Sequence, residues 1–195
     1  MKRVELSFLE KVFKSSGVWN SKKARIEELS REELALAEKL ASFGLLKIED
    51  GRSLTLTDLI AFMEWFLAQG ISVEELVGAM NWKGLERIVF EILTHNGFHA
   101  MLNYVLKVGK TRKEIDVVGY KEPYLLLVEC KRHKSVSRSQ LLEAVRKLKE
   151  KALLMCREEC FDSILEDYGS WDVVRMVPVV VTWLSPPFKK LEGTP

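Results

Sequence analysis

The chain has 195 residues, of which 47% are hydrophobic and 30% are charged. This length and composition predict a globular protein of one large or two small domains and exclude a largely disordered chain. No apolar run approaches the roughly 20 residues of a membrane helix, no apolar signal stretch follows the N-terminus, and the three cysteines lack a disulfide-framework spacing, so we expect a cytoplasmic protein.

Charge is unevenly distributed along the chain, although the net charge is only +2. The segment from Lys107 to Lys151 holds thirteen Lys or Arg and six Asp or Glu, an excess of seven positive charges. Residues 1–82 and 152–195 each carry a small acidic excess. A local basic block of this kind is typical of a face that binds phosphates, although a solvated surface would have the same composition.

The first part of the chain predicts short helices around a hairpin. Ser30 and Glu33 form a capping-box pattern at the start of one helix, and Thr57 is expected to cap another. The predicted elements are helices at Leu6–Lys14, Ala24–Leu29, Ser30–Phe43, Asp58–Gln69 and Val73–Met80, and strands at Leu45–Ile48 and Ser53–Leu56.

This order, and the stretch "LASFGLLKIEDGRSLTLTDL" at Leu40–Leu59, resembles a winged-helix domain. The resemblance implies a small, mainly helical winged-helix-like domain over residues 1–81, in which Ser30–Phe43 would be the helix that enters the DNA major groove. That segment mixes Arg31 and Lys39 with three glutamates, so DNA binding and binding to a protein partner both stay open.

The second part, residues 82–195, alternates helices and strands. The expected order is a helix at Gly84–Asn96, strands at Phe98–Val108, Glu114–Tyr120 and Tyr124–Cys130, helices at Arg138–Met155 and Phe161–Tyr168, and a strand at Val173–Leu184. This order predicts an α/β domain with a mixed sheet flanked by helices.

Two neighbouring strands of this domain end on charged residues. Asp116 stands among apolar residues of one strand, and the next strand runs from Leu125 into Glu129 and Lys131, which share a face because strand side chains alternate. Two carboxylates placed together repel one another and lose hydration, and a divalent cation removes that cost. A lysine beside them can hold an attacking water, so the three residues predict metal-assisted phosphodiester hydrolysis. A plain salt bridge at the strand ends is the alternative.

The spacing resembles the D…ExK motif of the restriction-endonuclease-like, PD-(D/E)xK superfamily. Twelve residues separate Asp116 from Glu129-Cys130-Lys131, and Ile115 stands where the superfamily name has proline. The segments "GLERIVFEILTHNGF", "EIDVVG" and "LLLVECKRHK" resemble the archaeal Holliday-junction resolvase and Mrr-like branches, in which a helix acid precedes a glycine by eleven positions. Glu86 and Gly97 have that spacing.

The resemblance implies roles for individual residues. Asp116, Glu129 and the Cys130 carbonyl would bind Mg²⁺ or Mn²⁺, Lys131 would position the attacking water, and Glu86 would support the site. Gln140 is a further candidate. Four basic residues are expected to contact the nucleic-acid backbone: Lys113, Arg132, Lys134 and Arg138.

The sequence therefore predicts a Mg²⁺-dependent endonuclease that hydrolyses DNA in repair, recombination or restriction. Its partner would be DNA, and a homodimer would suit two-strand cleavage. Three alternatives remain: a non-catalytic DNA-binding or scaffold protein, an RNA-processing nuclease on the same fold, and a transcription regulator that acts through the N-terminal domain alone.

Overall fold

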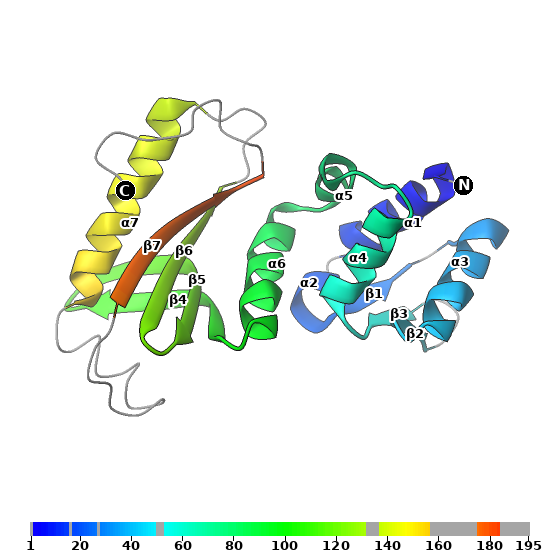
Figure 1. The fold of residues 1–195 in the computed structure, drawn as a ribbon, viewed down its shortest axis with the longest axis horizontal. Coiled ribbons are helices and arrows are strands. Elements are labelled where there is room, and N and C mark those ends of the chain that lie inside the picture. The colour runs from blue at the N-terminus through cyan, green and yellow to red at the C-terminus, as the bar shows by residue number, and fades with distance from the viewer. Residues whose placement is uncertain are drawn as a thin grey trace. The chain divides into compact units, whose positions relative to one another are not determined.

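The structure of the chain is a computed structural model, and it describes residues 2–15, 17–26, 28–49, 53–131, 137–156 and 175–183. The chain folds into two compact units, Met1–Glu91 and Ile92–Pro195 (Figure 1). Each unit has its own sheet. The predicted division at residues 81 and 82, which separates functional domains rather than packing units, stays a prediction.

The N-terminal unit packs helices around a small antiparallel sheet. The sheet has the strand order β1-β3-β2. The elements of this unit are α1 (Lys2–Lys14), α2 (Val18–Ser21), β1 (Lys23–Arg25), α3 (Arg31–Ser42), β2 (Leu46–Ile48), β3 (Ser53–Leu56), α4 (Leu59–Ala68), α5 (Val73–Ala79) and the first part of α6 (Trp82–His95).

Two local predictions for this unit are wrong. The predicted helix at Ala24–Leu29 is replaced by strand β1, because Ala24 is fully buried against Leu54 of β3. Helix α4 is capped by Asp58, whose carboxylate accepts from the backbone N–H groups of Ile60 and Ala61, and not by Thr57. The capping box at the start of α3 is confirmed.

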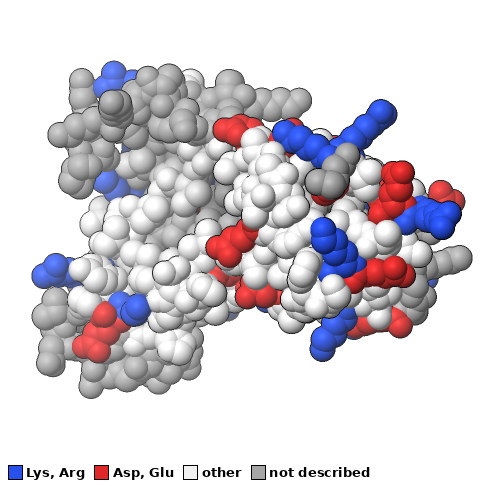
Figure 2. Space-filling view, turned by 45° about the vertical axis from the view of Figure 1, so that its right-hand side comes forward, with Lys and Arg blue, Asp and Glu red and all other residues white. Residues whose placement is uncertain are grey.

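Charges of both signs lie side by side on the N-terminal unit. Its ion pairs include Lys11 with the buried Glu33 and Lys23 with Glu49. Figure 2 shows Lys or Arg and Asp or Glu side chains interspersed on the described part of the face that it draws. The winged-helix-like assignment and its DNA-reading helix stay predictions.

The C-terminal unit is built on a mixed four-stranded sheet of order β4-β5-β6-β7. Strands β4 (His99–Val108), β5 (Thr111–Lys121) and β6 (Tyr124–Lys131) are antiparallel neighbours, and β7 (Arg175–Thr182) runs parallel to β6. Helix α7 (Arg138–Met155) lies between β6 and β7 in the chain. The predicted mixed α/β fold is thus confirmed, while the predicted helix at Phe161–Tyr168 lies outside the described residues.

Helix α7 covers one face of this sheet. It begins at Ser137, whose hydroxyl accepts from the Gln140 N–H while the Gln140 side chain accepts from the Ser137 N–H. Leu148 and Met155 of α7 are buried in a core that the sheet supplies with Leu106, Ile115, Val118, Tyr120, Leu125 and Leu127.

On β5, Gly119 leaves no room for a side chain, since an added Cβ would meet Leu93 of α6 at 2.7 Å. No described helix is long and apolar enough to cross a membrane.

The ladder between β4 and β5 has a gap beside Asp116. Backbone pairs run up to Leu102 with Val117 and resume at Tyr104 with Ile115, which leaves Asn103 and Asp116 outside the register. Asn103 adopts a left-handed φ of 52°, a conformation that asparagine tolerates better than other residues with a side chain. A local irregularity in the strand therefore lies at the level of the predicted metal-binding residue.

We expect Asn103→Val to lower the free energy of unfolding by about 1–2 kcal/mol, because a β-branched residue is strained at positive φ. Asn103→Gly, which needs no Cβ at this position, should match the wild type or exceed it slightly. Chemical denaturation of the three proteins checks this. Equal stability of the valine and glycine variants would contradict the strained conformation.

Candidate metal-binding active site

Strands β5 and β6 separate where the predicted site begins. Their backbone pairing ends at Val117 with Val128, while β6 stays paired with β7 as far as Lys131. The Cys130 N–H is instead bound by a side chain: it donates to Asp116 Oδ2 at 2.7 Å. The parting of the strands thus fixes the Asp116 carboxylate against the backbone of β6.

Glu129 is held by two lysines. Its side chain is 11% exposed, and it points to the sheet face that α7 covers, as Leu125 and Leu127 of the same strand do. Lys131 Nζ donates to Glu129 Oε1 at 2.6 Å, and Lys151 Nζ of α7 donates to Oε2 at 2.6 Å. Both carboxylate oxygens therefore face a cation.

The pKa values of Asp116 and Glu129 are shifted in opposite directions. Burial raises the pKa of Asp116, the charge of Glu129 raises it further, and the Cys130 hydrogen bond and the two lysines only partly oppose them. Burial acts on Glu129 in the same sense, but the hydrogen bonds from Lys131 and Lys151 outweigh it and hold the pKa of Glu129 below its ordinary value. Glu129 is thus kept ionised, whereas Asp116 carries an uncompensated cost of ionisation.

A salt bridge alone explains Glu129 but not Asp116. Lys131 and Lys151 both donate to Glu129, whereas Asp116 accepts a hydrogen bond from a backbone N–H, that of Cys130. A divalent cation beside Asp116 would offset the repulsion that raises its pKa. The donor set, two carboxylates and nearby backbone carbonyls, consists of hard oxygen atoms, which suit Mg²⁺ or Mn²⁺.

Among the described residues, no three His, Cys, Asp or Glu side chains are grouped so that they could hold a metal ion together. A metal here would therefore have two carboxylate ligands and complete its shell with backbone oxygen and water. Mg²⁺ commonly keeps several waters and binds through one or two carboxylates, so the residues present fit this ion. The Cys130 carbonyl as a further ligand stays a prediction.

Lys151 is the site residue that the sequence reasoning missed. Its side chain is 14% exposed, although lysine is almost never buried without a partner. A signal was present: Lys151 falls at helical spacing within the buried face of α7, which otherwise consists of Leu141, Ala144, Leu148 and Met155. A lone cation in an apolar stripe indicates a buried anion on the surface that the helix covers.

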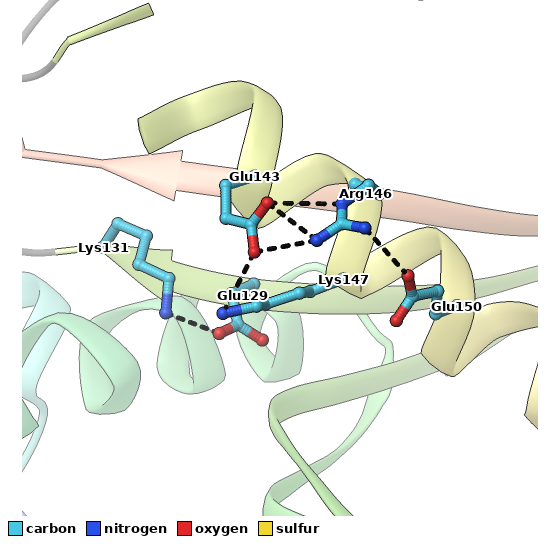
Figure 3. A network of polar contacts seen from close by, with 6 residues as sticks. All are labelled: Glu129, Lys131, Glu143, Arg146, Lys147 and Glu150. Atoms are coloured by element: carbon cyan, nitrogen blue, oxygen red, sulfur yellow. Dashed lines mark hydrogen bonds and ion pairs between the residues drawn. The ribbon is translucent and has the colours of Figure 1, made fainter. Parts of the chain in front are cut away.

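A cavity of about 230 Å³ opens beside the two site residues of β6. It is lined by Glu129, Lys131, Gln140, Glu143, Ala144 and Lys147. Figure 3 shows Lys131 directed toward Glu129, with Glu143 and Lys147 on the neighbouring helix. Gln140 therefore borders the candidate site, but its side-chain oxygen caps α7, and a role in the reaction stays a prediction.

The remaining predicted site residues lie on α6, on β5, at the start of α7 or outside the described residues. Glu86 lies half-buried on α6 in the N-terminal unit, and its supporting role stays a prediction. Lys113 on β5 and Arg138 at the start of α7 are both exposed. Arg132 and Lys134 lie outside the described residues.

We expect Asp116→Asn to abolish metal binding without harming the metal-free fold. The asparagine oxygen can still accept from the Cys130 N–H, and the repulsion from Glu129 disappears. Mg²⁺ at 100 times its Kd should stabilise the wild type by about 2.7 kcal/mol and the variant not at all. Thermal unfolding with EDTA and with Mg²⁺ measures both effects.

The same variant tests whether folding raises the pKa of Asp116. A carboxyl whose pKa is raised by folding contributes stability at low pH and loses it as pH rises from the ordinary Asp value through the raised one. Metal-free Asp116→Asn should therefore gain stability relative to the wild type as pH rises through that interval. A variant that loses stability there would contradict the raised pKa.

We expect Lys151→Met to lower the free energy of unfolding by about 1.5–3 kcal/mol, because a charge-assisted hydrogen bond to the buried Glu129 is lost. Lys149→Met, an exposed position on the same helix, should change stability by less than about 0.5 kcal/mol. Denaturation in EDTA compares the two. Equal effects would show that Lys151 does not support Glu129.

A known family model matches part of the chain. Residues 77–157 match the model of the Mrr_cat family, described as a restriction endonuclease; this segment is less than half of the chain. It contains Glu86, Asp116, Glu129 and Lys131. No curated protein matches the chain.

The solved structures similar to this chain include three distant likenesses. The protein of unknown function AF1548 is 18% identical, with a TM-score of 0.31, and the alignment covers 50% of this chain and 44% of that protein. VC1899 from Vibrio cholerae is 17% identical, with a TM-score of 0.31 and coverage of 93% and 42%.

Can2 from Sulfobacillus thermosulfidooxidans, solved in complex with cyclic tetra-adenylate, is 12% identical, with a TM-score of 0.34 and coverage of 90% and 47%. The chain thus spans less than half the length of each of these proteins. Likenesses of this size carry no argument about function. Residues 77–157 are similar to the Mrr_cat family of restriction endonucleases, and the mixed α/β architecture of the described residues is consistent with a restriction-endonuclease-like fold.

Proposed function

We propose that this protein is a metal-dependent endonuclease that hydrolyses DNA phosphodiester bonds. The observation that carries the proposal is the placement of Asp116, Glu129 and Lys131 where β5 and β6 part. Adjacent strands supply a lysine and two carboxylates, one of which is costly to ionise. The Mrr_cat match over residues 77–157 supports a nuclease of the restriction-endonuclease type.

Each residue would have a distinct part in the reaction. Asp116 and Glu129 would hold the Mg²⁺ or Mn²⁺ ion, which supplies charge stabilisation at the scissile phosphate when bound. Lys131 would orient the attacking water and, when it leaves Glu129 Oε1, free that oxygen for the cation. Lys151 would keep Glu129 ionised and in place, because its bond is to the other oxygen.

The pathway, the oligomeric state and the DNA contacts are further parts of this proposal. Repair, recombination and restriction all need a nuclease of this kind, and cutting both strands of a duplex needs two such sites, which a homodimer would provide. Glu86 would support the metal directly or through water. Arg132, Lys134, Arg138 and Lys113 would contact the DNA backbone.

We expect the wild type to cut at least one member of a DNA panel with Mg²⁺ or Mn²⁺ but not with EDTA. The panel contains single-stranded, duplex, flap and four-way-junction substrates. Asp116→Asn and Lys131→Ala should each lower the single-turnover rate by at least about 10²-fold, since each removes a group that acts at the scissile phosphate.

Lys149→Ala, which changes an exposed lysine of α7, is the matched control and should cut at the wild-type rate. RNA of the same sequence, assayed in parallel, separates the DNA enzyme from an RNA-processing nuclease. DNA binding with no cutting of either polymer would contradict the proposal in favour of a non-catalytic binding protein.

A further inference from the structure

A second cavity shares Lys147 with the cavity beside the candidate site. It measures about 140 Å³ and is lined by Lys113, Arg146, Lys147, Glu150, Lys151 and Leu154. Lys147 lines both cavities, and Lys151 joins this one to Glu129 through its 2.6 Å bond. The second cavity is therefore one side chain away from the predicted metal ligand but contains none of the predicted catalytic residues.

The lining of this cavity is strongly basic. Four of the six lining residues are cations and one is an anion. The helical members, Arg146, Lys147, Glu150, Lys151 and Leu154, recur at the spacing of one face of α7, so the helix presents them together. Lys113 reaches the same hollow from β5, which means that the cations come from two rigid elements.

The cations of the cavity differ in how firmly they are held. Lys151 is bound to the buried Glu129. Arg146 and Lys147 pair with Glu143, but these side chains are 65%, 63% and 45% exposed. Such exposed pairs contribute about 0–1 kcal/mol and exchange readily. Within the described chain, Lys113 forms no ion pair.

An anion with several acceptor oxygens could therefore replace the weak partners of this cavity. Arg146 donates to both carboxylate oxygens of Glu143 at 2.9–3.2 Å and lies 3.8 Å from Glu150 (Figure 3). The same planar guanidinium can bind a phosphate through two parallel hydrogen bonds in place of this exposed carboxylate. The cavity has room for about four or five waters at roughly 30 Å³ each, and hence for one tetrahedral anion in their place.

We propose that this cavity binds a DNA backbone phosphate neighbouring the phosphate that is cleaved, with Lys113 and Arg146 as its principal contacts. The inference rests on the proposed nuclease function and adds a positioning subsite to it. Because Lys147 lines both cavities, we expect neighbouring phosphates of one strand to occupy them when the scissile one lies beside Glu129 and Lys131. The subsite fixes the register of the strand and takes no part in the bond that breaks.

The test measures DNA binding in EDTA, so that it does not depend on metal or cleavage. Fluorescence anisotropy of a labelled duplex is recorded against NaCl concentration for the wild type, Lys113→Ala and Arg146→Ala. Each alanine variant should bind several-fold more weakly, and its slope of log K against log salt should be shallower by about 0.9 per lost phosphate contact.

Two controls separate a subsite from a general loss of charge. Lys149→Ala removes the same charge from the same helix but lines neither cavity, and it should bind like the wild type. Lys113→Arg keeps the charge and should restore the wild-type slope. Steady-state cleavage should show a raised KM for Lys113→Ala with kcat changed by less than about threefold, since the contact positions substrate.

The outcomes distinguish this inference from the proposed function. If Asp116→Asn abolishes cutting but Lys113→Ala and Arg146→Ala bind like Lys149→Ala, the nuclease stands and the subsite is overturned. If no protein cuts DNA, but Lys113→Ala and Arg146→Ala bind it more weakly and with a shallower salt slope than the wild type, the phosphate subsite stands and the nuclease function does not. A wild type that does not bind DNA in EDTA would also overturn the subsite.

Discussion

The hydrogen bond from the Cys130 N–H to the Asp116 carboxylate is the interaction on which the candidate site depends. It forms because β5 and β6 stop pairing after Val117 and Val128, while β6 continues beside β7. A backbone donor that the ladder no longer uses must find another acceptor. Asp116 supplies it, and this fixes one carboxylate beside the strand that carries the other.

Helix α7 provides the second constraint. It follows β6 in the chain and packs on the face of the sheet to which Glu129 points. From there, its Lys151 donates a hydrogen bond to a carboxylate oxygen of Glu129. The charges of Asp116, Glu129, Lys131 and Lys151 balance, so the metal-free site needs no net buried charge. The balance is uneven, since both lysines bind Glu129, and the raised pKa of Asp116 reflects this asymmetry.

Sequence reasoning predicted the C-terminal fold well, because long periodic segments and turns determine it. The bounds of α7 were predicted as the structure has them, and β5 and β6 came within a few residues. The predicted helix at Ala24–Leu29 failed because three residues of β1 are held as a strand only by pairing with β3, a contact that no local pattern shows.

The candidate site was predictable to a lesser extent. The spacing of Asp116, Glu129 and Lys131 could be read because alternation and motif are properties of the chain itself. The contribution of Lys151 depends on how α7 packs over β6, and the break at Asn103 depends on pairing with β5. Both are tertiary effects, although the interrupted apolar stripe of α7 was a usable sign of the first.

Cys130 holds Asp116 through its backbone N–H. Every residue except proline can donate the N–H that holds Asp116, so this contact places little demand on the side chain between the glutamate and the lysine. The variable middle position of an ExK motif thus has a physical meaning: many side chains are compatible with it, but its backbone must carry an N–H. In a search for related chains, proline at that position would be stronger grounds for rejecting a candidate than any change of the cysteine to another residue.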